Sequence, residues 1–203
     1  MITTILFDVG NVLLTFNPKE YYSDKIEKEK LDSLLEVFFS GNTWNQYDQG
    51  MYTEQELKMI FLNKAPELKE EINYFFDTYL NTLAPIEPNV KLALSLKKNY
   101  RISILSNMPE ISEYYIIEKF PFLNEFELPL YSWKVRMIKP DSAIYNLQIE
   151  RLKSKPEEIL FIDDKQENLD TAAKLGMHTY LMKDTLNAPT EIISYIKTVN
   201  QKS

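Results

Sequence analysis

Short apolar runs bounded by turn-forming residues recur along the chain, one near its start and four after residue 100. Runs of this kind, rich in apolar or β-branched residues, are typical of buried strands. We therefore predict strands at Ile2–Phe7, Arg101–Leu105, Phe126–Tyr131, Glu158–Ile162 and Thr179–Met182. Apolar residues at helical spacing separate most of them, and alternating strands and helices indicate a parallel α/β sheet. The predicted helices are Tyr114–Lys119, Ser142–Leu152, Asn168–Leu175 and Thr190–Val199.

The stretch from residue 21 to residue 82 has a different pattern. Aromatic and leucine side chains recur at helical spacing, and Thr53 and Glu56 form a capping box that predicts the start of a helix. Prolines punctuate both borders, at Asn17-Pro18 and at residues 85–88. We therefore predict an all-helical domain, residues 17–85, inserted into an α/β core made of residues 1–16 and 86–203.

Composition narrows the classes of function. The 203 residues carry 30 acidic and 23 basic side chains, and the net charge of -7 gives no general attraction to nucleic acid or to an anionic membrane. Without cysteine the chain has no disulfide, no thiol nucleophile and no cysteine-bound zinc, so metal chemistry must rest on oxygen ligands. The first apolar run is too short for a signal peptide or a membrane span. We expect a cytoplasmic protein with no nucleic-acid, membrane or obligate protein partner.

Polar side chains directly follow three of the predicted strands. Asp8 follows the first, Ser106 and Asn107 the second, and Asp163 and Asp164 the fourth. The carboxyl ends of parallel strands share one edge of the sheet, where ligands bind, so we expect these groups to converge. Three carboxylates at one site would repel one another unless a hard cation lay among them. Mg²⁺ is the natural candidate because it takes oxygen ligands.

Lys139 precedes Pro140 at the start of a predicted helix. Alone, this pattern is typical of a surface lysine beside a helix cap. Beside the carboxylate cluster, a fixed cation would offset negative charge and bind a phosphate, and we favour that interpretation.

These segments resemble, in order, the four motifs of the haloacid dehalogenase superfamily. FDVGNVL resembles motif I, ILSNM motif II, IKPDSAIY motif III and FIDDKQEN motif IV, and the helical insertion lies where the family has its cap domain. Motifs I and IV are similar to those of small sugar-phosphate phosphatases, including bacterial alpha-D-glucose-1-phosphate phosphatase, and of the N-terminal domain of soluble epoxide hydrolases. The resemblance implies a Rossmann-like core with a helical cap, and a Mg²⁺-dependent phosphatase for a small phosphorylated metabolite such as glucose 1-phosphate.

The resemblance also implies roles for single residues. Asp8 would be the nucleophile that forms an aspartyl-phosphate, and Lys139 would neutralise charge on the nucleophile and the phosphate. Ser106 and the Asn107 backbone would hold the phosphoryl oxygens. The Mg²⁺ ligands would be Asp8, the Gly10 carbonyl and Asp164, with Asp163 and Asn168 completing the shell directly or through water.

Gly10 departs from the family pattern. Most phosphatases of the superfamily have a second aspartate there, two residues after the nucleophile, which protonates the leaving group and then activates water. A positioned general acid contributes about 10²–10⁴-fold in rate. Its loss favours a substrate with an acidic leaving oxygen, such as a hexose 1-phosphate, unless water or a substrate hydroxyl carries the proton.

Two alternatives stay open. A haloacid dehalogenase would use Asp8 to displace a halide, which needs no leaving-group proton. Such enzymes usually have tyrosine at the position of Gly10 and do not need Mg²⁺, and the pair Asp163 and Asp164 argues against them. A catalytically weak binding or regulatory member of the superfamily is supported by the missing acid alone.

Substrate choice is expected to depend on the helical insertion. Its segment Gly41–Gly50 is polar and aromatic and lies between two helical patterns. It would present Trp44 and Tyr47 to a sugar, with Asp48 among their polar neighbours. In the alternative interpretation both rings pack inside the insertion, because buried aromatic residues dominate small helical cores.

Overall fold

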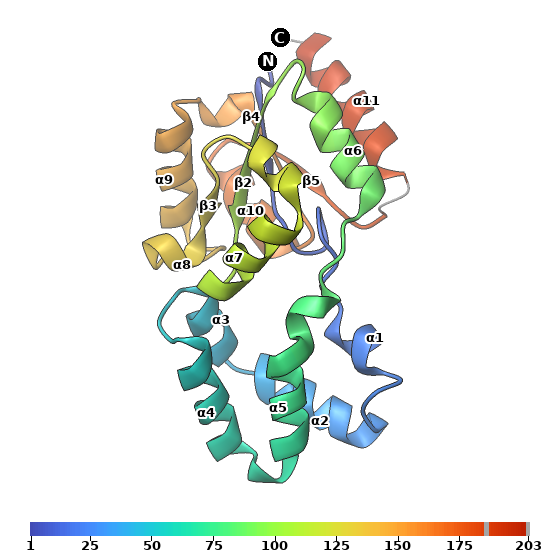
Figure 1. Ribbon diagram of the computed structural model, residues 1–203. Coiled ribbons are helices and arrows are strands. Elements are labelled where there is room, and N and C mark those ends of the chain that lie inside the picture. The colour runs from blue at the N-terminus through green and yellow to red at the C-terminus, as the bar shows by residue number, and fades with distance from the viewer. Residues whose placement is uncertain (185–186, 202–203) are drawn as a thin grey trace.

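The computed structural model describes residues 1–184 and 187–201. Five parallel strands form one sheet in the order β3-β2-β1-β4-β5, with helices around it (Figure 1). This confirms the predicted Rossmann-like α/β fold. The third strand is shorter than predicted because Leu128 has a positive φ of 48° and Pro129 has no N–H to donate. The strands are β1 (Thr4–Phe7), β2 (Arg101–Ser106), β3 (Leu130–Tyr131), β4 (Ile159–Asp163) and β5 (His178–Leu181).

The central strand, β1, shows how the sheet is covered on both faces. Ile5 and Phe7 pack into one hydrophobic cluster with α6, α7 and α11, whereas Leu6 packs on the opposite face with α9 and α10. None of the helices in the described part of the chain is long and apolar enough to cross a membrane. The core helices are α6 (Glu87–Leu96), α7 (Glu110–Lys119), α8 (Ser132–Val135), α9 (Ser142–Leu152), α10 (Gln166–Lys174) and α11 (Ala188–Gln201).

The register of the sheet places the C-terminal ends of β1, β2 and β4 level with one another. Phe7 of β1 pairs with Ile104 of β2 on one side and with Ile162 of β4 on the other. Asp8 continues this alignment, since its N–H donates to the Ile162 carbonyl at 2.9 Å. β1 therefore ends at a switch point of the topology, where an open α/β sheet forms a ligand crevice.

Between β1 and α6 the chain forms a helical unit with a hydrophobic core of its own, drawn below the sheet in Figure 1. Phe38 and Phe75 lie in that core with ring centroids 4.7 Å apart. The predicted capping box is confirmed: Thr53 Oγ1 accepts from Glu56 N at 3.2 Å, and Glu56 Oε2 accepts from Thr53 N at 2.8 Å. The helices of the unit are α1 (Pro18–Tyr22), α2 (Lys28–Phe39), α3 (Thr43–Asp48), α4 (Glu54–Lys64) and α5 (Lys69–Thr78).

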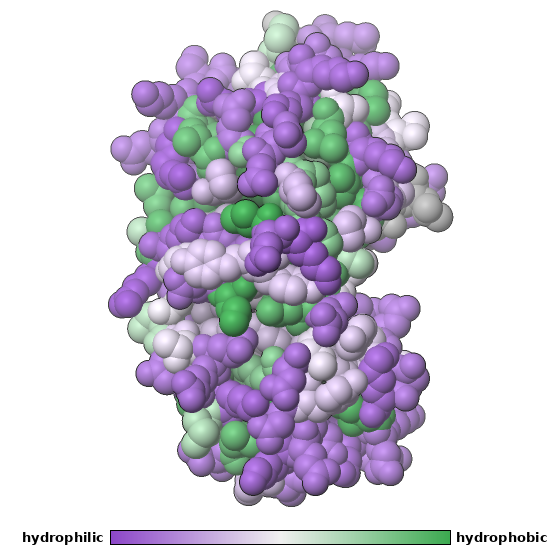
Figure 2. Space-filling view, viewed as in Figure 1, coloured by the Kyte–Doolittle hydropathy of each residue, from purple (hydrophilic) through white to green (hydrophobic). Residues whose placement is uncertain are grey.

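Two connecting segments join the helical unit to the core, and they bond to each other. Thr15 N donates to the Ala84 carbonyl at 2.8 Å, and Ile86 N donates to the Leu13 carbonyl at 2.9 Å. The outline of the molecule narrows between the two parts (Figure 2). The two connections of the helical unit to the core thus lie side by side, near the end of β1.

Candidate active site

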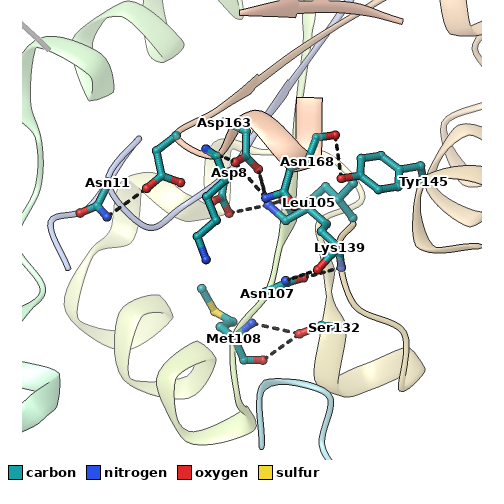
Figure 3. Close-up of polar contacts among 12 residues, drawn as sticks. Asp8, Asn11, Leu105, Asn107, Met108, Ser132, Lys139, Tyr145, Asp163 and Asn168 are labelled. Carbon is teal, nitrogen blue, oxygen red and sulfur yellow. Dashed lines mark hydrogen bonds and ion pairs between the residues drawn. The ribbon is translucent and has the colours of Figure 1, made fainter. Parts of the chain in front are cut away.

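Side chains from the four predicted motifs lie together at the carboxyl edge of the sheet. Asp8 follows β1, Ser106 ends β2, Lys139 precedes α9, and Asp163 ends β4. Figure 3 shows Asp8, Lys139 and Asp163 directed toward one another. Lys139 Nζ lies 3.0 Å from Asp8 Oδ1 and 2.7 Å from Asp163 Oδ2. Lys139 is 4% exposed and Asp8 8% exposed, so this pair is sheltered from solvent yet reachable from the crevice.

Lys139 is held in place through its backbone as well as its side chain. Asn107 Nδ2 donates to the Lys139 carbonyl, and Asn107 Oδ1 accepts from Lys139 N, both at 2.9 Å. Lys139 Nζ also donates to the Leu105 carbonyl at 3.0 Å. Burial lowers the pKa of Lys139, but the carboxylates of Asp8 and Asp163 outweigh it and hold the pKa above its ordinary value. The ammonium group therefore stays charged at neutral pH.

Asp8 is buried beside one cation and two further carboxylates. Burial raises the pKa of Asp8 to about 6, while Lys139 lowers it, Asp163 and Asp164 raise it, and the Ser106 hydroxyl lowers it. Asp8, Asp163 and Asp164 can each offer an oxygen within 4.8 Å of the others. Three oxygen donors and a surplus of negative charge fit a hard divalent cation.

The two neighbouring aspartates after β4 have different surroundings. Asp163 Oδ1 accepts from Lys165 N at 2.8 Å and from Asn168 Nδ2 at 2.9 Å, and its Oδ2 accepts from Asn168 Nδ2 at 3.0 Å and from Lys139. Asp164 is half-buried, and its Oδ2 accepts from Asn11 Nδ2 at 3.1 Å. Asp163 thus orients Lys139, and Asp164 keeps more capacity for a metal. Asn168 contacts Asp163 through its amide nitrogen, and the prediction that it joins a metal shell stays a prediction.

The turn after β1 leaves the Gly10 carbonyl available. Asn11 N donates to the Leu14 carbonyl, and the N–H groups of Val12, Leu13 and Leu14 donate to the Val9 carbonyl, so these bonds in the described chain do not use the Gly10 carbonyl. The predicted use of the Gly10 carbonyl as a metal ligand is compatible with this turn and stays a prediction.

Ser132, at the start of α8, is a site residue that sequence reasoning missed. Its hydroxyl accepts from Met108 N at 3.0 Å and donates to the Asp48 carbonyl of the helical unit. It therefore links the loop after β2 to the end of α3. The sequence around it carries no signal for this role, whereas Asn11, also missed, lies inside motif I and could have been found there.

Trp44 and Tyr47 lie in the hydrophobic core of the helical unit. They are 8% and 2% exposed, and Tyr47 packs against Trp44 with ring centroids 5.7 Å apart. Tyr47 Oη also lies 3.4 Å from Tyr79 Oη. This burial favours the packing interpretation, and substrate contact by either ring stays a prediction.

Gly50 of the helical unit packs against Trp133 of the core, and a substitution at Gly50 tests this contact. Its φ is +75°, and a Cβ would lie 2.8 Å from the Trp133 carbonyl oxygen. We expect Gly50→Ala to lower the free energy of unfolding by about 1–3 kcal/mol, because alanine is strained in this conformation and must displace backbone. Urea denaturation measures the change. Gly41→Ala is the matched control, since its Cβ meets nothing within 4 Å; equal effects of both variants would contradict the proposed close contact.

A cavity of about 770 Å³ lies between the core and the helical unit, beside the carboxylate cluster. Asn11 and Asp164 line it from the core, and Glu20 and Tyr21 line it from α1. Its lining combines these polar groups with the apolar side chains of Ile86 and Met182.

Known proteins similar to this chain include hydrolases and phosphatases. Bifunctional epoxide hydrolase 2 of Sus scrofa is 27% identical over 183 residues, covering 86% of this chain and 33% of that protein. The phosphorylated carbohydrates phosphatase of Thermotoga maritima is 21% identical over 182 residues, covering 85% of this chain and 81% of that protein. The chain spans a third or less of the length of the bifunctional epoxide hydrolases of rat, mouse and pig that it matches.

A solved structure shares the fold. It is a haloacid dehalogenase family enzyme from Bacteroides thetaiotaomicron in complex with magnesium and inorganic phosphate. Its TM-score is 0.71 at 23% identity, and the match covers 89% of this chain and 94% of that chain. The family model for haloacid dehalogenase-like hydrolases matches residues 2–176. With its motifs arranged around one sheet edge, the chain belongs to the haloacid dehalogenase-like hydrolase family.

Proposed function

We propose that this enzyme is a Mg²⁺-dependent phosphomonoester hydrolase that acts through an aspartyl-phosphate on Asp8. The observation that carries the proposal is the buried Lys139 ammonium, which lies 3.0 Å from Asp8 and 2.7 Å from Asp163. A cation in this position lowers the repulsion between an attacking carboxylate and an anionic phosphate. Phosphoryl transfer depends chiefly on positioning and on such charge neutralisation.

The chain's own residues would divide the work as follows. Asp8 attacks phosphorus from the end of β1, and Lys139 stabilises the charge that moves onto the phosphoryl oxygens. The Ser106 hydroxyl and the Asn107 backbone bind those oxygens, while the Asn107 side chain keeps Lys139 in place. Asp163 orients Lys139 from the other side.

The carboxylate cluster is the proposed Mg²⁺ site. Asp8, the Gly10 carbonyl and Asp164 would ligate the ion, with Asp163 and Asn168 completing the shell directly or through water. Bound Mg²⁺ would supply charge neutralisation to the phosphate. The magnesium and phosphate named for the Bacteroides thetaiotaomicron enzyme support this assignment.

We propose that the substrates are small sugar phosphates, with glucose 1-phosphate as the leading candidate. We also propose that the enzyme acts in the cytoplasm. The polar side chains that line the cavity, among them Asn17 and Glu20, support a hydrophilic substrate, and so does the name of the Thermotoga maritima relative. The helical unit, with residues 17–85 as its proposed bounds, would be the cap on a core of residues 1–16 and 86–203. A cap of this kind excludes water and contacts the substrate beyond its phosphate.

The test is phosphate release from a panel of phosphomonoesters with Mg²⁺ or with a chelator. We expect release from sugar 1-phosphates ahead of sugar 6-phosphates, and a loss of at least about tenfold with the chelator that added Mg²⁺ reverses. Halide release from 2-haloacids without phosphate release would identify a dehalogenase instead. Ligand binding without either product would identify a regulatory protein.

A further inference from the structure

The aspartate that serves as proton donor in most phosphatases of the superfamily is missing from this chain. Gly10 occupies the position two residues after Asp8. Lys139 is paired with two carboxylates, and Asp163 accepts hydrogen bonds at both oxygens. A group that protonates the leaving oxygen can come from the helical unit, whose helix α3 contacts α8 of the core.

Asp48 is the last residue of α3, which lies against α8 of the core (Figure 1). Its carbonyl accepts from the Ser132 hydroxyl, and the same hydroxyl accepts from Met108 N at 3.0 Å. The next residue is also anchored, because Gln49 Nε2 donates to the Arg136 carbonyl at 2.9 Å. The backbone of Asp48 is thus fixed relative to the loop that follows β2, which carries Asn107 and Met108.

The side chain of Asp48 interacts electrostatically with the active site. Burial raises the pKa of Asp48 to about 7, the positive charge of Lys165 lowers it, and the negative charge of Asp8 raises it. Lys165 directly follows the Asp163-Asp164 pair. The Asp48 carboxyl group therefore lies in the field of both the nucleophile and the proposed metal site.

Several charged groups on the elements packed against α3 pair with other residues, among them Lys30 of α2, which pairs with Glu71 at 2.6 Å. Glu54 of α4 accepts from Tyr79 Oη at 2.8 Å, and Lys134 of α8 pairs with Glu113 at 2.6 Å. Arg136, beyond α8, has an exposed side chain, and its carbonyl binds Gln49. Asp8 and Lys165 are thus the charges that act on the Asp48 carboxyl group.

We infer that Asp48 is the general acid and base of this enzyme, supplied by the helical unit in place of the aspartate that Gly10 replaces. The inference rests on the proposed phosphatase function. In the first step an Asp8 oxygen bonds to phosphorus, the ester P–O bond breaks, and the leaving oxygen takes the proton of the Asp48 carboxyl group. In the second, the Asp48 carboxylate takes a proton from water, the water oxygen bonds to phosphorus, and the P–O bond to Asp8 breaks. Each cycle consumes one ester and one water and releases one alcohol and one phosphate.

The experiment compares Asp48→Asn with the wild-type enzyme on two classes of ester. Sugar 6-phosphates have a basic leaving oxygen that needs a proton, whereas p-nitrophenyl phosphate leaves as a stable anion. We expect kcat/KM for the sugar 6-phosphate to fall by about 10²–10³-fold and kcat/KM for p-nitrophenyl phosphate to fall by less than about tenfold. Asp77→Asn is the matched control, since Asp77 is an exposed carboxylate of α5 paired with Lys58 at 3.5 Å.

A second variant separates proton transfer from structure. A Cβ at Gly10 meets nothing within 4 Å, and Gly10 is not among the glycines with positive φ, so the Cβ of Gly10→Asp fits without backbone strain. The double variant Gly10→Asp, Asp48→Asn should have a kcat/KM for the sugar 6-phosphate at least about tenfold higher than Asp48→Asn alone. An equal loss on both esters, no rescue, or no loss would each overturn the role of Asp48. A wild-type enzyme inactive on every ester would instead overturn the phosphatase function.

Protein stability gives a readout that does not depend on turnover. The pKa of Asp48 in the folded protein, about 7, lies above its ordinary 3.8. The folded state therefore binds this proton more tightly than the unfolded chain, and ionisation of Asp48 lowers stability as the pH rises toward 7. In metal-free protein, the Tm of Asp48→Asn relative to wild type should increase between pH 5 and pH 8. A difference that is independent of pH would contradict the burial of this carboxyl group at the site.

Discussion

Asp8→Asn is expected to reduce phosphate release by at least about 10⁴-fold, because it removes the nucleophile on which the covalent step depends. The amide keeps the shape of the side chain but does not attack phosphorus. Acid-quenched wild-type enzyme should carry a phosphoryl group detectable by intact mass spectrometry, and the variant should not.

Loss of folding does not account for that result. Lys139 retains Asp163 at 2.7 Å and the Leu105 carbonyl at 3.0 Å when Asp8 is neutral. Burial raises the pKa of Asp8 to about 6, so the ionised carboxylate is destabilising at pH 7.5, and the variant should be at least as stable as wild type there. Activity that survives in a folded Asp8→Asn variant would place the nucleophile elsewhere.

Lys139→Met is expected to lower the free energy of unfolding by about 3–5 kcal/mol at pH 7.5, since it leaves buried carboxylates without their cation. Asp8 and Asp163 lose ion pairs of 3.0 and 2.7 Å. Urea denaturation in chelator measures the loss. Lys91→Met removes a lysine whose side chain is 77% exposed, and should change stability by less than about 0.5 kcal/mol.

The loss of unfolding free energy in Lys139→Met, relative to wild type, should depend on pH. Lys139 lowers the pKa of Asp8, so its removal raises that pKa further above 6. Protonation of Asp8 then relieves the unpaired charge as the pH falls, and the difference from wild type should shrink between pH 7.5 and pH 5. A deficit that is constant over this range would mean that lost packing, and not lost charge compensation, destabilises the variant.

The sequence predicted the core of the site because its residues follow strands whose order and direction could be inferred. Asp8, Ser106 and Asp163 each follow a short apolar run, and parallel strands place such residues at one edge. The third strand was predicted too long, since the pattern of Phe126–Tyr131 does not show that Leu128 takes a positive φ. Local apolar patterns therefore predicted which strands exist better than where they end.

Contacts between the helical unit and the core could not be predicted in this way. Ser132 and Asp48 are 84 residues apart, and their hydrogen bond depends on how two separately packed units meet. The aromatic pattern of Gly41–Gly50 likewise did not distinguish rings that face a ligand from rings that face a core. Trp44 and Tyr47 are buried, and the pKa of the half-buried Asp48 beside them is raised by burial and by the charge of Asp8.

During synthesis, β1 leaves the ribosome long before either of its neighbours in the sheet. β2 begins at Arg101 and β4 at Ile159, so Asp8 has neither Lys139 nor Asp163 beside it until most of the chain has been made. The helical unit is complete earlier and has its own hydrophobic core, so its contacts are local and form readily. We therefore expect the helical unit of the nascent chain to form next to an unpaired central strand, and the catalytic edge to assemble only after Asp163 has emerged.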